Sequence, residues 1–364
     1  MRKLILLYFV LIMLTSCNNT TDHKIKIGFV AGFTGKYSTT SIKIRDGFML
    51  AFNEINYKIH DKKIKIIQKD DKQDPAIAKK IAQYFIKNNI KLIIGNATSS
   101  MTNVTLNELK NKNDFLLASI LASSNDFSNK DDNFVRTQVD DNSKQYTRLK
   151  SYFIKNNIKK VFYIYDNNNF NYTKGYFNFF QNILIDSGGE KFINSKPIHD
   201  GYKNIINKLK NSTFDMILIV ASSSDTANLI QHIKLNQINN QIMISEWANT
   251  NDFIEFGGKV IEGVIVNSGY NQESQDSKYL EFKNRFKKFY KREASTYEAK
   301  GYEMAKIIIK NLKKTTDISK LKNLIINEKT YEGLQGKIIF NKYGDVYKEY
   351  FIMKLENGKF KRVP

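Results

Sequence analysis

Residues 25–55 read IKIGFVAGFTGKYSTTSIKIRDGFMLAFNEI. The apolar run at 25–30 predicts a short strand, and a loop bounded by Gly32 and Gly35 follows it. Apolar residues then recur at helical spacing over 44–55, which predicts a helix. A strand, a loop and a helix form the repeating unit of α/β proteins, so this stretch sets the expectation for the whole chain.

The same alternation continues in two sets. The first set of expected strands lies at 64–67, 92–94 and 115–118, and the second at 161–165, 216–220 and 241–245. Segments with helical periodicity separate these strands, and Asp74-Pro75 has the residue types of a helix start. Because strand–helix–strand connections are right-handed crossovers, each set predicts a parallel sheet.

The last part of the chain has a different pattern. Two long amphipathic helices are expected over 279–290 and 297–312. Strands are expected at 337–340 and 350–355, with a hairpin-type turn at 356–359. Two α/β units followed by mixed elements predict two lobes, between which the chain crosses more than once.

The N-terminal residues have the pattern of an export signal. Arg2 and Lys3 precede an apolar run over 4–14, which has the length of a signal-peptide core and is too short to span a bilayer. Leu14-Thr15-Ser16-Cys17 then resembles the lipobox of bacterial lipoproteins, in which cleavage before the cysteine leaves its thiol for lipid attachment. We therefore expect a signal peptide at 1–16, lipidation of Cys17 and a tether over 17–24. The alternatives are a cleaved signal that happens to contain a cysteine, and a buried thiol.

On this interpretation the chain is exported and lipid-anchored to a bacterial membrane, facing the periplasm or the cell exterior. Cys17 is the only cysteine, so no disulfide within the chain is expected. The formal net charge is +21, but the lysines are spread along the chain among Asn and Ile residues. Since no nucleic-acid-binding motif accompanies this charge, we expect no nucleic-acid partner, and at most weak attraction to an anionic bilayer.

Known catalytic and cofactor patterns are absent from the sequence. It contains no G-x-S-x-G elbow and no Walker sequence. Val30 occupies the position at which a dinucleotide fingerprint needs its second glycine, so no cofactor is expected. No metal site is expected either, because the four histidines lack ligand spacing: His23, His60, His199 and His232. The sequence therefore indicates a protein that is not an enzyme.

Hydroxyl side chains follow most of the expected strands, at 38–40, 98–100, 119–124 and 222–224. Ligands of open parallel sheets bind beyond the carboxyl ends of the strands, so these are candidate site residues. Each cluster is also a favoured helix N-cap, which needs no ligand. Their repetition favours a site in which helix N-termini hold a carboxylate, while Glu246, at another strand end, holds an ammonium group. Trp247 is either a wall of this site or interior packing.

A series of short segments runs nearly from end to end of the chain. They are Ile27-Gly28, Thr34-Gly35, Arg45-Asp46-Gly47, Asn53-Glu54-Ile55-Asn56, Asp70-Asp71-Lys72-Gln73-Asp74-Pro75, Phe134-Val135-Arg136-Thr137, Tyr165-Asp166, Tyr172-Thr173-Lys174-Gly175, Gly257-Gly258, Glu262-Gly263-Val264, Gly333-Leu334-Gln335-Gly336, Phe340, Gly344-Asp345 and Asn357-Gly358-Lys359. In this order they resemble the branched-chain amino-acid (leucine, isoleucine, valine) binding proteins of ABC importers, which have the type I periplasmic-binding-protein fold.

The resemblance implies an α/β fold of two Rossmann-like lobes with parallel sheets, joined by a hinge of three crossovers. The crossovers are expected near 136–140, 264–268 and 334–340. The N-terminal lobe would then comprise 25–137 and 267–333, and the C-terminal lobe 138–266 and 334–364.

The resemblance also implies roles for particular residues. Ser99 and Ser123 would bind the ligand carboxylate, and the Leu121 carbonyl and Glu246 would receive its ammonium group. An aromatic side chain would close over the ligand, either Tyr172 or, because the loop 167–171 is long, Phe170. Two further residues complete the predicted site: Thr40 in the first loop and Ser222 near the ligand side chain.

We therefore expect a lipid-anchored solute-binding component of an ABC importer, which captures a small ligand, an amino acid, between closing lobes. Its partners would be this ligand, an ABC permease and the bilayer. The alternatives are a ligand-sensing receptor of the same fold, and a binder of an amide, urea or peptide-like solute.

Overall fold

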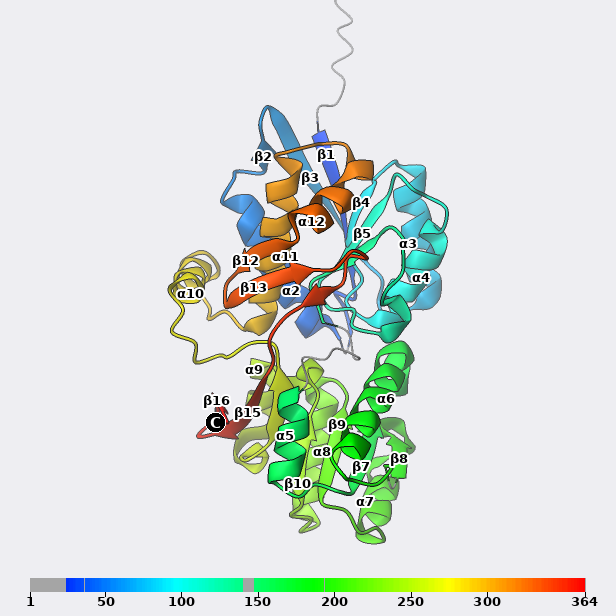
Figure 1. The fold of residues 1–364 in the computed structure, drawn as a ribbon, viewed down its shortest axis with the longest axis vertical. Helices are drawn as coiled ribbons and strands as arrows, with labels where there is room; N and C mark the ends of the chain where they lie inside the picture. Colours follow the sequence, from blue (N-terminus) through cyan, green and yellow to red (C-terminus); the bar gives the residue numbers. More distant parts are fainter. Residues whose placement is uncertain (1–23, 36, 140–146, 193, 364) are drawn as a thin grey trace, which may run out of the picture.

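The computed structural model describes residues 24–35, 37–139, 147–192 and 194–363. The expected signal peptide, Cys17 and almost all of the expected tether lie outside these residues. No helix within the described ranges is long and apolar enough to span a membrane. The molecule consists of two lobes arranged along its longest axis (Figure 1).

The first lobe is built on a six-stranded sheet with the order β2-β3-β1-β4-β5-β6. Its strands are β1 (Lys24–Ala31), β2 (Lys58–Ile59), β3 (Lys62–Asp70), β4 (Leu92–Gly95), β5 (Leu116–Ser119) and β6 (Phe134–Arg136). All neighbours are parallel except the edge strand β2. Strands β4 and β5 are buried along their whole length, as expected of parallel strands covered on both faces.

Helices cover both faces of this sheet. They are α2 (Ser38–Asn53), α3 (Pro75–Lys87), α4 (Ser99–Leu109), α11 (Thr296–Leu312) and α12 (Leu321–Glu328). Ile93 and Leu117 pack in one cluster with residues of α3 and α4, whereas Ile94 and Leu116 pack in another with α2 and α11. The alternation of side chains along the strands thus supplies two cores from one sheet. Asp74 caps α3 as predicted, since its Oδ1 accepts hydrogen bonds from two backbone N–H groups.

The second lobe is built on a seven-stranded sheet with the order β16-β15-β11-β10-β9-β7-β8. Its strands are β7 (Val161–Tyr165), β8 (Asn194–Pro197), β9 (Met216–Val220), β10 (Gln241–Ile244), β11 (Ile265–Ser268), β15 (Phe351–Glu356) and β16 (Lys359–Arg362). Its helices are α5 (Thr147–Lys155), α6 (Phe170–Asp186), α7 (Tyr202–Lys210), α8 (Ser223–Leu235) and α9 (Asn251–Gly257). The neighbouring strands β8, β7, β9, β10 and β11 are parallel, and β15 and β16 add an antiparallel hairpin. Its predicted turn is present, with Asn357 and Gly358 both at positive φ.

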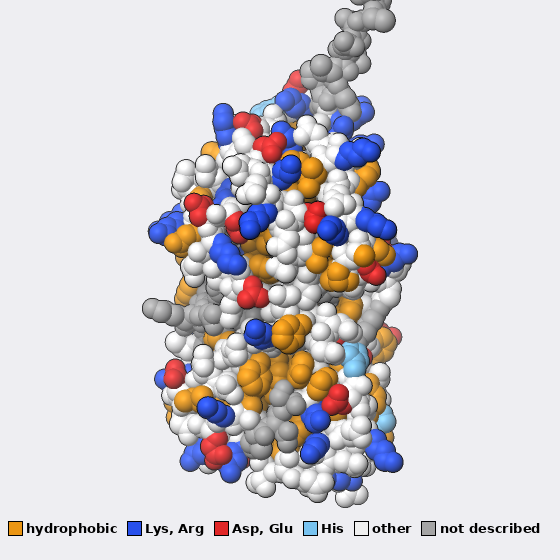
Figure 2. Space-filling model, turned by 90° about the vertical axis from the view of Figure 1, so that its right-hand side faces the viewer, with side chains coloured by type: hydrophobic (Ala, Val, Ile, Leu, Met, Phe, Trp, Pro, Cys, Tyr) orange, Lys and Arg blue, Asp and Glu red, His pale blue; other side chains and the backbone are white. Residues whose placement is uncertain are grey.

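Several short elements complete the fold. The helix α10 (Ser277–Tyr290) lies beside α2. Single 3₁₀ turns occur at η1 (Asn125–Phe127), η3 (Asn167–Asn169), η4 (Ile198–Asp200), η5 (Glu246–Ala248), η6 (Gly258–Ile261) and η7 (Ile318–Lys320). On the face drawn in Figure 2, Lys and Arg side chains are scattered over both lobes among Asp and Glu.

The chain passes between the lobes through three hinge segments, whose described residues are 137–139, 269–276 and 348–350. The first lies within the range 136–140 that the resemblance implied. The second follows β11, which belongs entirely to the second sheet, so the expected boundary at residue 267 falls inside a strand.

The third hinge segment lies later than the expected range 334–340. Those residues contribute to β13 (Gly336–Phe340), which pairs with β12 (Thr330–Gly333) and β14 (Val346–Tyr347) in a small antiparallel sheet. This sheet lies against the first lobe, where Arg136 N–H donates to the Gly344 carbonyl at 3.0 Å. The boundary implied by the resemblance placed β13 in the C-terminal lobe, whereas β13 pairs with β12 and β14 beside the first lobe.

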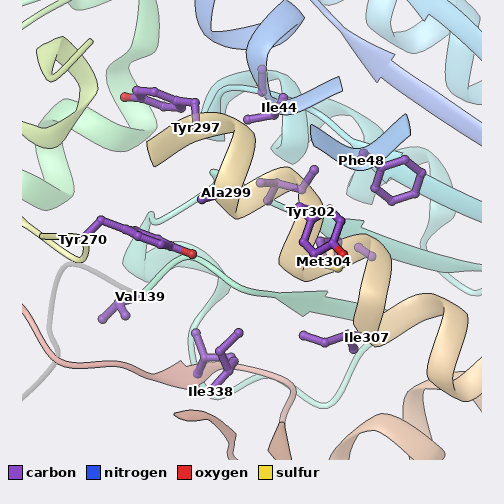
Figure 3. Packing of buried hydrophobic residues seen from close by; sticks show 14 of the residues in the cluster. Ile44, Phe48, Val139, Tyr270, Tyr297, Ala299, Tyr302, Met304, Ile307 and Ile338 are labelled. Atoms are coloured by element: carbon purple, nitrogen blue, oxygen red, sulfur yellow. The ribbon is translucent and has the colours of Figure 1, made fainter. Parts of the chain in front are cut away.

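Helix α11 is packed unusually close to α2. A Cβ atom on Gly47 would lie 1.9 Å from the Glu298 carbonyl oxygen, and one on Gly301 would lie 2.0 Å from that of Ile44. Only glycine at both positions permits this approach. Figure 3 shows Tyr297, Ala299 and Tyr302 of α11 beside Ile44 of α2, within a core shared by the hinge. This packing fixes the position of the α11 N-terminus, which reaches the cleft between the lobes.

Candidate ligand-binding cleft

The ends of several strands meet at a cavity of about 50 Å³ between the lobes. The first lobe and hinge contribute Ala97, Thr98, Ser99, Leu121, Ser123, Gln138, Tyr297 and Lys300. The second lobe contributes Asn169, Tyr172, Glu246 and Trp247. A larger hollow of about 600 Å³ lies beside α4, but it contains none of the strand-end residues.

Five of the seven predicted ligand-binding residues line this one cavity: Ser99, Leu121, Ser123, Tyr172 and Glu246. Phe170, the alternative to Tyr172, is 54% exposed. The remaining two predicted residues are not among the lining residues and are engaged locally. Thr40 Oγ1 donates to the Tyr37 carbonyl at 3.2 Å, and Ser222 Oγ accepts from Asp225 N–H as the N-cap of α8. The observed contacts of Ser222 are therefore those of a helix N-cap, which was the alternative to a role in ligand binding.

The two serines of the first lobe are adjacent because β4 and β5 are neighbours. Ser99 Oγ accepts hydrogen bonds from the N–H groups of Ser123 and Ser124, both at 3.3 Å. Since a hydroxyl that accepts two bonds has only its own O–H left, Ser99 can donate to a ligand. Ser123 is 4% exposed, and its Oγ makes no hydrogen bond within the part of the chain that the structure describes.

Two further features make this end of the cavity suited to an anion. Ser99 begins the eleven-residue helix α4, whose N-terminus carries a partial positive charge. The loop after β5 is held by Arg136, a fully buried residue whose Nη1 donates to the Ser124 carbonyl at 2.9 Å. Asp345 neutralises this guanidinium at 2.8 Å, and Arg136 is not among the lining residues, so it acts on the cavity by positioning the loop.

At the opposite end, Glu246 follows β10 in the turn η5 and is 7% exposed. Its Oε2 accepts from Lys300 Nζ at 2.8 Å, from Gln138 Nε2 at 3.2 Å and from the Tyr350 hydroxyl at 3.5 Å. Its Oε1 accepts from Ser268 Oγ and from Gly269 N–H, both at 2.9 Å. Burial disfavours the charged form of Glu246, but the Lys300 ammonium and these donors outweigh it and hold the pKa of the carboxyl below its usual value.

Aromatic side chains form the walls between these ends. Trp247 stacks on Tyr37 at a centroid distance of 5.4 Å and meets the edge of Tyr172 at 5.8 Å. The Tyr297 hydroxyl donates to the backbone carbonyls of Glu246 at 2.8 Å and Trp247 at 3.1 Å. Burial, and then the charge of Glu246, raise the pKa of Tyr297 far above its usual range, so it remains a donor. Trp247 is thus a wall of the cavity and also packs against the first lobe.

Residues 24–359 match the family described as periplasmic binding protein. The chain belongs to this family. Membership places it among binding proteins of the type I fold and not among enzymes, as the sequence predicted. No curated protein sequence matches the chain at a significant level.

Solved structures of periplasmic binding proteins have the same fold. The branched-chain amino acid transporter substrate-binding protein LivJ of Streptococcus pneumoniae, in complex with isoleucine, is 22% identical with a TM-score of 0.82, covering 93% of this chain and 98% of its own. The leucine-binding protein LivK of Thermotoga maritima is 18% identical with a TM-score of 0.84, covering 93% and 98%. An ABC transporter solute-binding protein of R. palustris, in complex with benzoate, is 14% identical with a TM-score of 0.84, covering 93% and 95%.

The lobes of this periplasmic binding protein contact each other around the cavity. The Tyr37 hydroxyl donates to Asp166 Oδ2 at 2.6 Å, and Lys43 Nζ pairs with Asp252 at 2.8 Å. On the other side, Ser100 N–H donates to Asn169 Oδ1 at 3.3 Å. The lobes therefore touch on more than one side of the cavity, as in the closed form of a hinged two-lobed protein.

Four of the polar and aromatic lining residues were not predicted from the sequence: Gln138, Asn169, Tyr297 and Lys300. Gln138 lies in a hinge segment and Asn169 in a 3₁₀ turn, where no periodicity marks a function. Tyr297 and Lys300 lie in the first turns of α11, which begins with the capping box Ser295-x-x-Glu298. That motif marks the start of the helix in the sequence, but nothing near it indicates that the helix ends at the cleft.

Proposed function

We propose that this periplasmic binding protein is the lipid-anchored solute-binding component of an ABC importer, and that it closes on a small carboxylate ligand. The observation that carries the proposal is the pairing of Ser99 and Ser123 at one end of an interlobe cavity. Both hydroxyls are buried there beside a helix N-terminus, and both can donate.

The ligands of similar proteins support a carboxylate. The S. pneumoniae protein is in complex with isoleucine, and the R. palustris protein is in complex with benzoate. These two ligands differ in their bodies and share a carboxylate group. The resemblance in sequence narrows the expectation to an amino acid, which also needs an acceptor for its ammonium group, and Glu246 is the predicted acceptor.

The sequence supports export and anchoring. A positive head, an apolar core and the lipobox-like Leu14-Thr15-Ser16-Cys17 precede the first strand. A lipid on Cys17 would keep the protein beside a permease and raise the effective concentration of their encounter. Mass spectrometry of the N-terminal peptide would compare untreated producing cells with cells treated with globomycin. The untreated sample should show a diacylglyceryl-modified Cys17.

Loss of the serine hydroxyls tests the carboxylate end. Ser99→Ala and Ser123→Ala are each expected to weaken binding of the copurified ligand, identified by mass spectrometry after mild denaturation, by about 10- to 100-fold. Each variant removes a hydrogen bond to a charged group, which is worth about 1.5–3 kcal/mol. Isothermal titration calorimetry measures the affinity.

Ser151→Ala is the matched control, because Ser151 lies on α5 and, among the described residues, its hydroxyl bonds only the Thr147 carbonyl. Its affinity should equal that of the wild type. Unchanged affinity in both cavity variants, or a copurified ligand without an acidic group, would refute the proposed carboxylate site.

A further inference from the structure

The acceptor capacity of Glu246 is filled by the protein itself. A carboxylate offers about four lone-pair positions. Five donors already surround its two oxygens, from Ser268, Gly269, Lys300, Gln138 and Tyr350. A ligand ammonium group could reach Glu246 only by displacing one of them.

Lys300 cannot be displaced easily. It is 7% exposed, and Nζ donates both to Glu246 Oε2 at 2.8 Å and to Gln138 Oε1 at 3.0 Å. A second ammonium group at Glu246 would place two cations against one buried carboxylate, and it would leave one of them without a full counter-charge. Lys300 thus occupies the position that a ligand ammonium would need.

The other lining groups supply no second negative charge for an ammonium group. The Leu121 carbonyl, also predicted as an acceptor, lines the cavity but is neutral. Asn169 Oδ1 already accepts from Ser100 N–H, and Gln138 Oε1 accepts from Lys300. Among the described lining residues, Glu246 and Lys300 carry the only formal charges, and these cancel. The hydroxyls of Ser99 and Ser123 can donate to a carboxylate, and they share the cavity with aromatic walls.

We propose that the ligand is a small monocarboxylate with an apolar or aromatic body and no ammonium group, and that Lys300 is the residue that excludes amino acids. This inference rests on the proposed function and specifies its ligand class. In it, Ser99 and Ser123 receive the carboxylate, while Tyr172, Trp247 and Tyr297 surround the body of the ligand.

Matched pairs of ligands test the inference. Calorimetric titrations of the wild type would compare leucine with 4-methylpentanoate, and phenylalanine with 3-phenylpropanoate, with benzoate as a fifth probe. We expect each deaminated acid to bind at least 10-fold more tightly than its amino acid. In Lys300→Met the freed Glu246 should accept an ammonium group, so the preference within at least one pair should shift toward the amino acid by 10-fold or more.

Lys306→Met is the control, because Lys306 lies on the exposed side of the same helix, 4.0 Å from Glu54. It should keep the wild-type order of affinities. If Lys300→Met does not fold, as judged by circular dichroism, two other measurements test the inference. They are the ratio of affinities within each ligand pair for the wild type, and the same titrations of Lys300→Gln.

The outcomes separate the two proposals. An amino acid that binds the wild type as tightly as its deaminated partner overturns this inference and leaves the carboxylate site standing. A Lys300→Met variant that folds and keeps the wild-type preference overturns the assigned role of Lys300. If none of the five carboxylates binds, both the inference and the proposed carboxylate function fail.

Discussion

At the scale of single residues, Glu246 connects the candidate binding cavity to the hinge between the lobes. Its carboxylate accepts hydrogen bonds from all three hinge segments, through Gln138, Gly269 and Tyr350, and from Lys300 of the opposite lobe. Breaking a buried ion pair by removing one partner leaves an uncompensated charge. Glu246 therefore contributes to the stability of the junction between the lobes, whatever it contributes to the ligand.

Glu246→Gln should destabilise the protein by about 3–5 kcal/mol at neutral pH, because Lys300 is left buried without its counter-charge. The pKa of Glu246 is lowered in the folded state from its ordinary value of 4.5, since the pull of Lys300 and the hydrogen bonds exceeds the cost of burial. The advantage of the wild type over the variant is thus complete above about pH 4.5 and is lost as the pH falls through the lowered folded pKa.

Urea unfolding of both proteins between pH 7 and pH 3 measures this difference. Glu255→Gln on α9 is the control, because Glu255 is exposed and lies outside the cavity. A wild-type advantage that does not diminish below pH 4.5 would show that the charge of Glu246 is not its source.

The sequence located part of this site for a physical reason. Ser99, Leu121, Ser123 and Glu246 follow parallel strands, and the carboxyl ends of such strands meet at one edge. Lys300 and Gln138 come from a helix and a hinge segment that reach the same cavity only through tertiary packing. Local patterns therefore indicated the hydroxyls that we propose as carboxylate donors but not Lys300, the cation that pairs with Glu246.

At the scale of elements, α11 determines how the first lobe faces the cleft. Its close contact with α2 depends on two glycines, each facing a carbonyl oxygen of the other helix. The sequence predicted a helix over 297–312, and the structure has α11 at Thr296–Leu312. Periodicity predicted the presence and the length of this helix. Its neighbour could not be predicted, because an amphipathic pattern does not specify which apolar surface the helix covers.

Gly301→Ala should destabilise the protein, although alanine is the better helix former by about 0.5–1 kcal/mol. The added Cβ would lie 2.0 Å from the Ile44 carbonyl oxygen, so the two backbones must separate. We expect a net loss of about 1–3 kcal/mol in urea unfolding, together with weaker ligand binding as Tyr297 and Lys300 shift.

Lys306→Ala is the control, because it introduces alanine into the same helix at an exposed position. Its stability should change by less than about 0.5 kcal/mol. A Gly301→Ala variant as stable as the wild type would mean that the helices are not in the close contact described.

At the scale of the whole molecule, closure is maintained by contacts between the lobes at the rim of the cleft. Burial, and then the charge and hydrogen bond of Asp166, raise the pKa of Tyr37 far above its usual range. The Tyr37 hydroxyl therefore remains a donor to Asp166 across the cleft. The two-lobed architecture was predictable from the repeated strand–helix units, whereas these contacts join loops far apart in the chain.

Tyr37→Phe keeps the ring that stacks on Trp247 and removes the hydroxyl that donates to Asp166. A bond to a charged acceptor is worth about 1.5–3 kcal/mol, so the equilibrium should move toward the open form by 10-fold or more. Small-angle X-ray scattering should then show a larger radius of gyration without ligand, and saturating ligand should restore the closed dimensions.

Tyr347→Phe is the matched control, since Tyr347 is 54% exposed on β14 and is not among the residues that line the cavity. It should leave the scattering profile unchanged. An unchanged profile and affinity for Tyr37→Phe as well would show that this contact does not hold the lobes together.

The direction of β1 has a mechanical consequence for a tethered protein. The strand begins at Lys24, at the pole of the first lobe farthest from the second, and runs toward the cleft (Figure 1). A lipid attached at Cys17, as we propose, would therefore restrain the outer pole of the first lobe and leave the second lobe without a direct attachment to the membrane. Ligand capture would then move the second lobe relative to a first lobe that is held near the membrane.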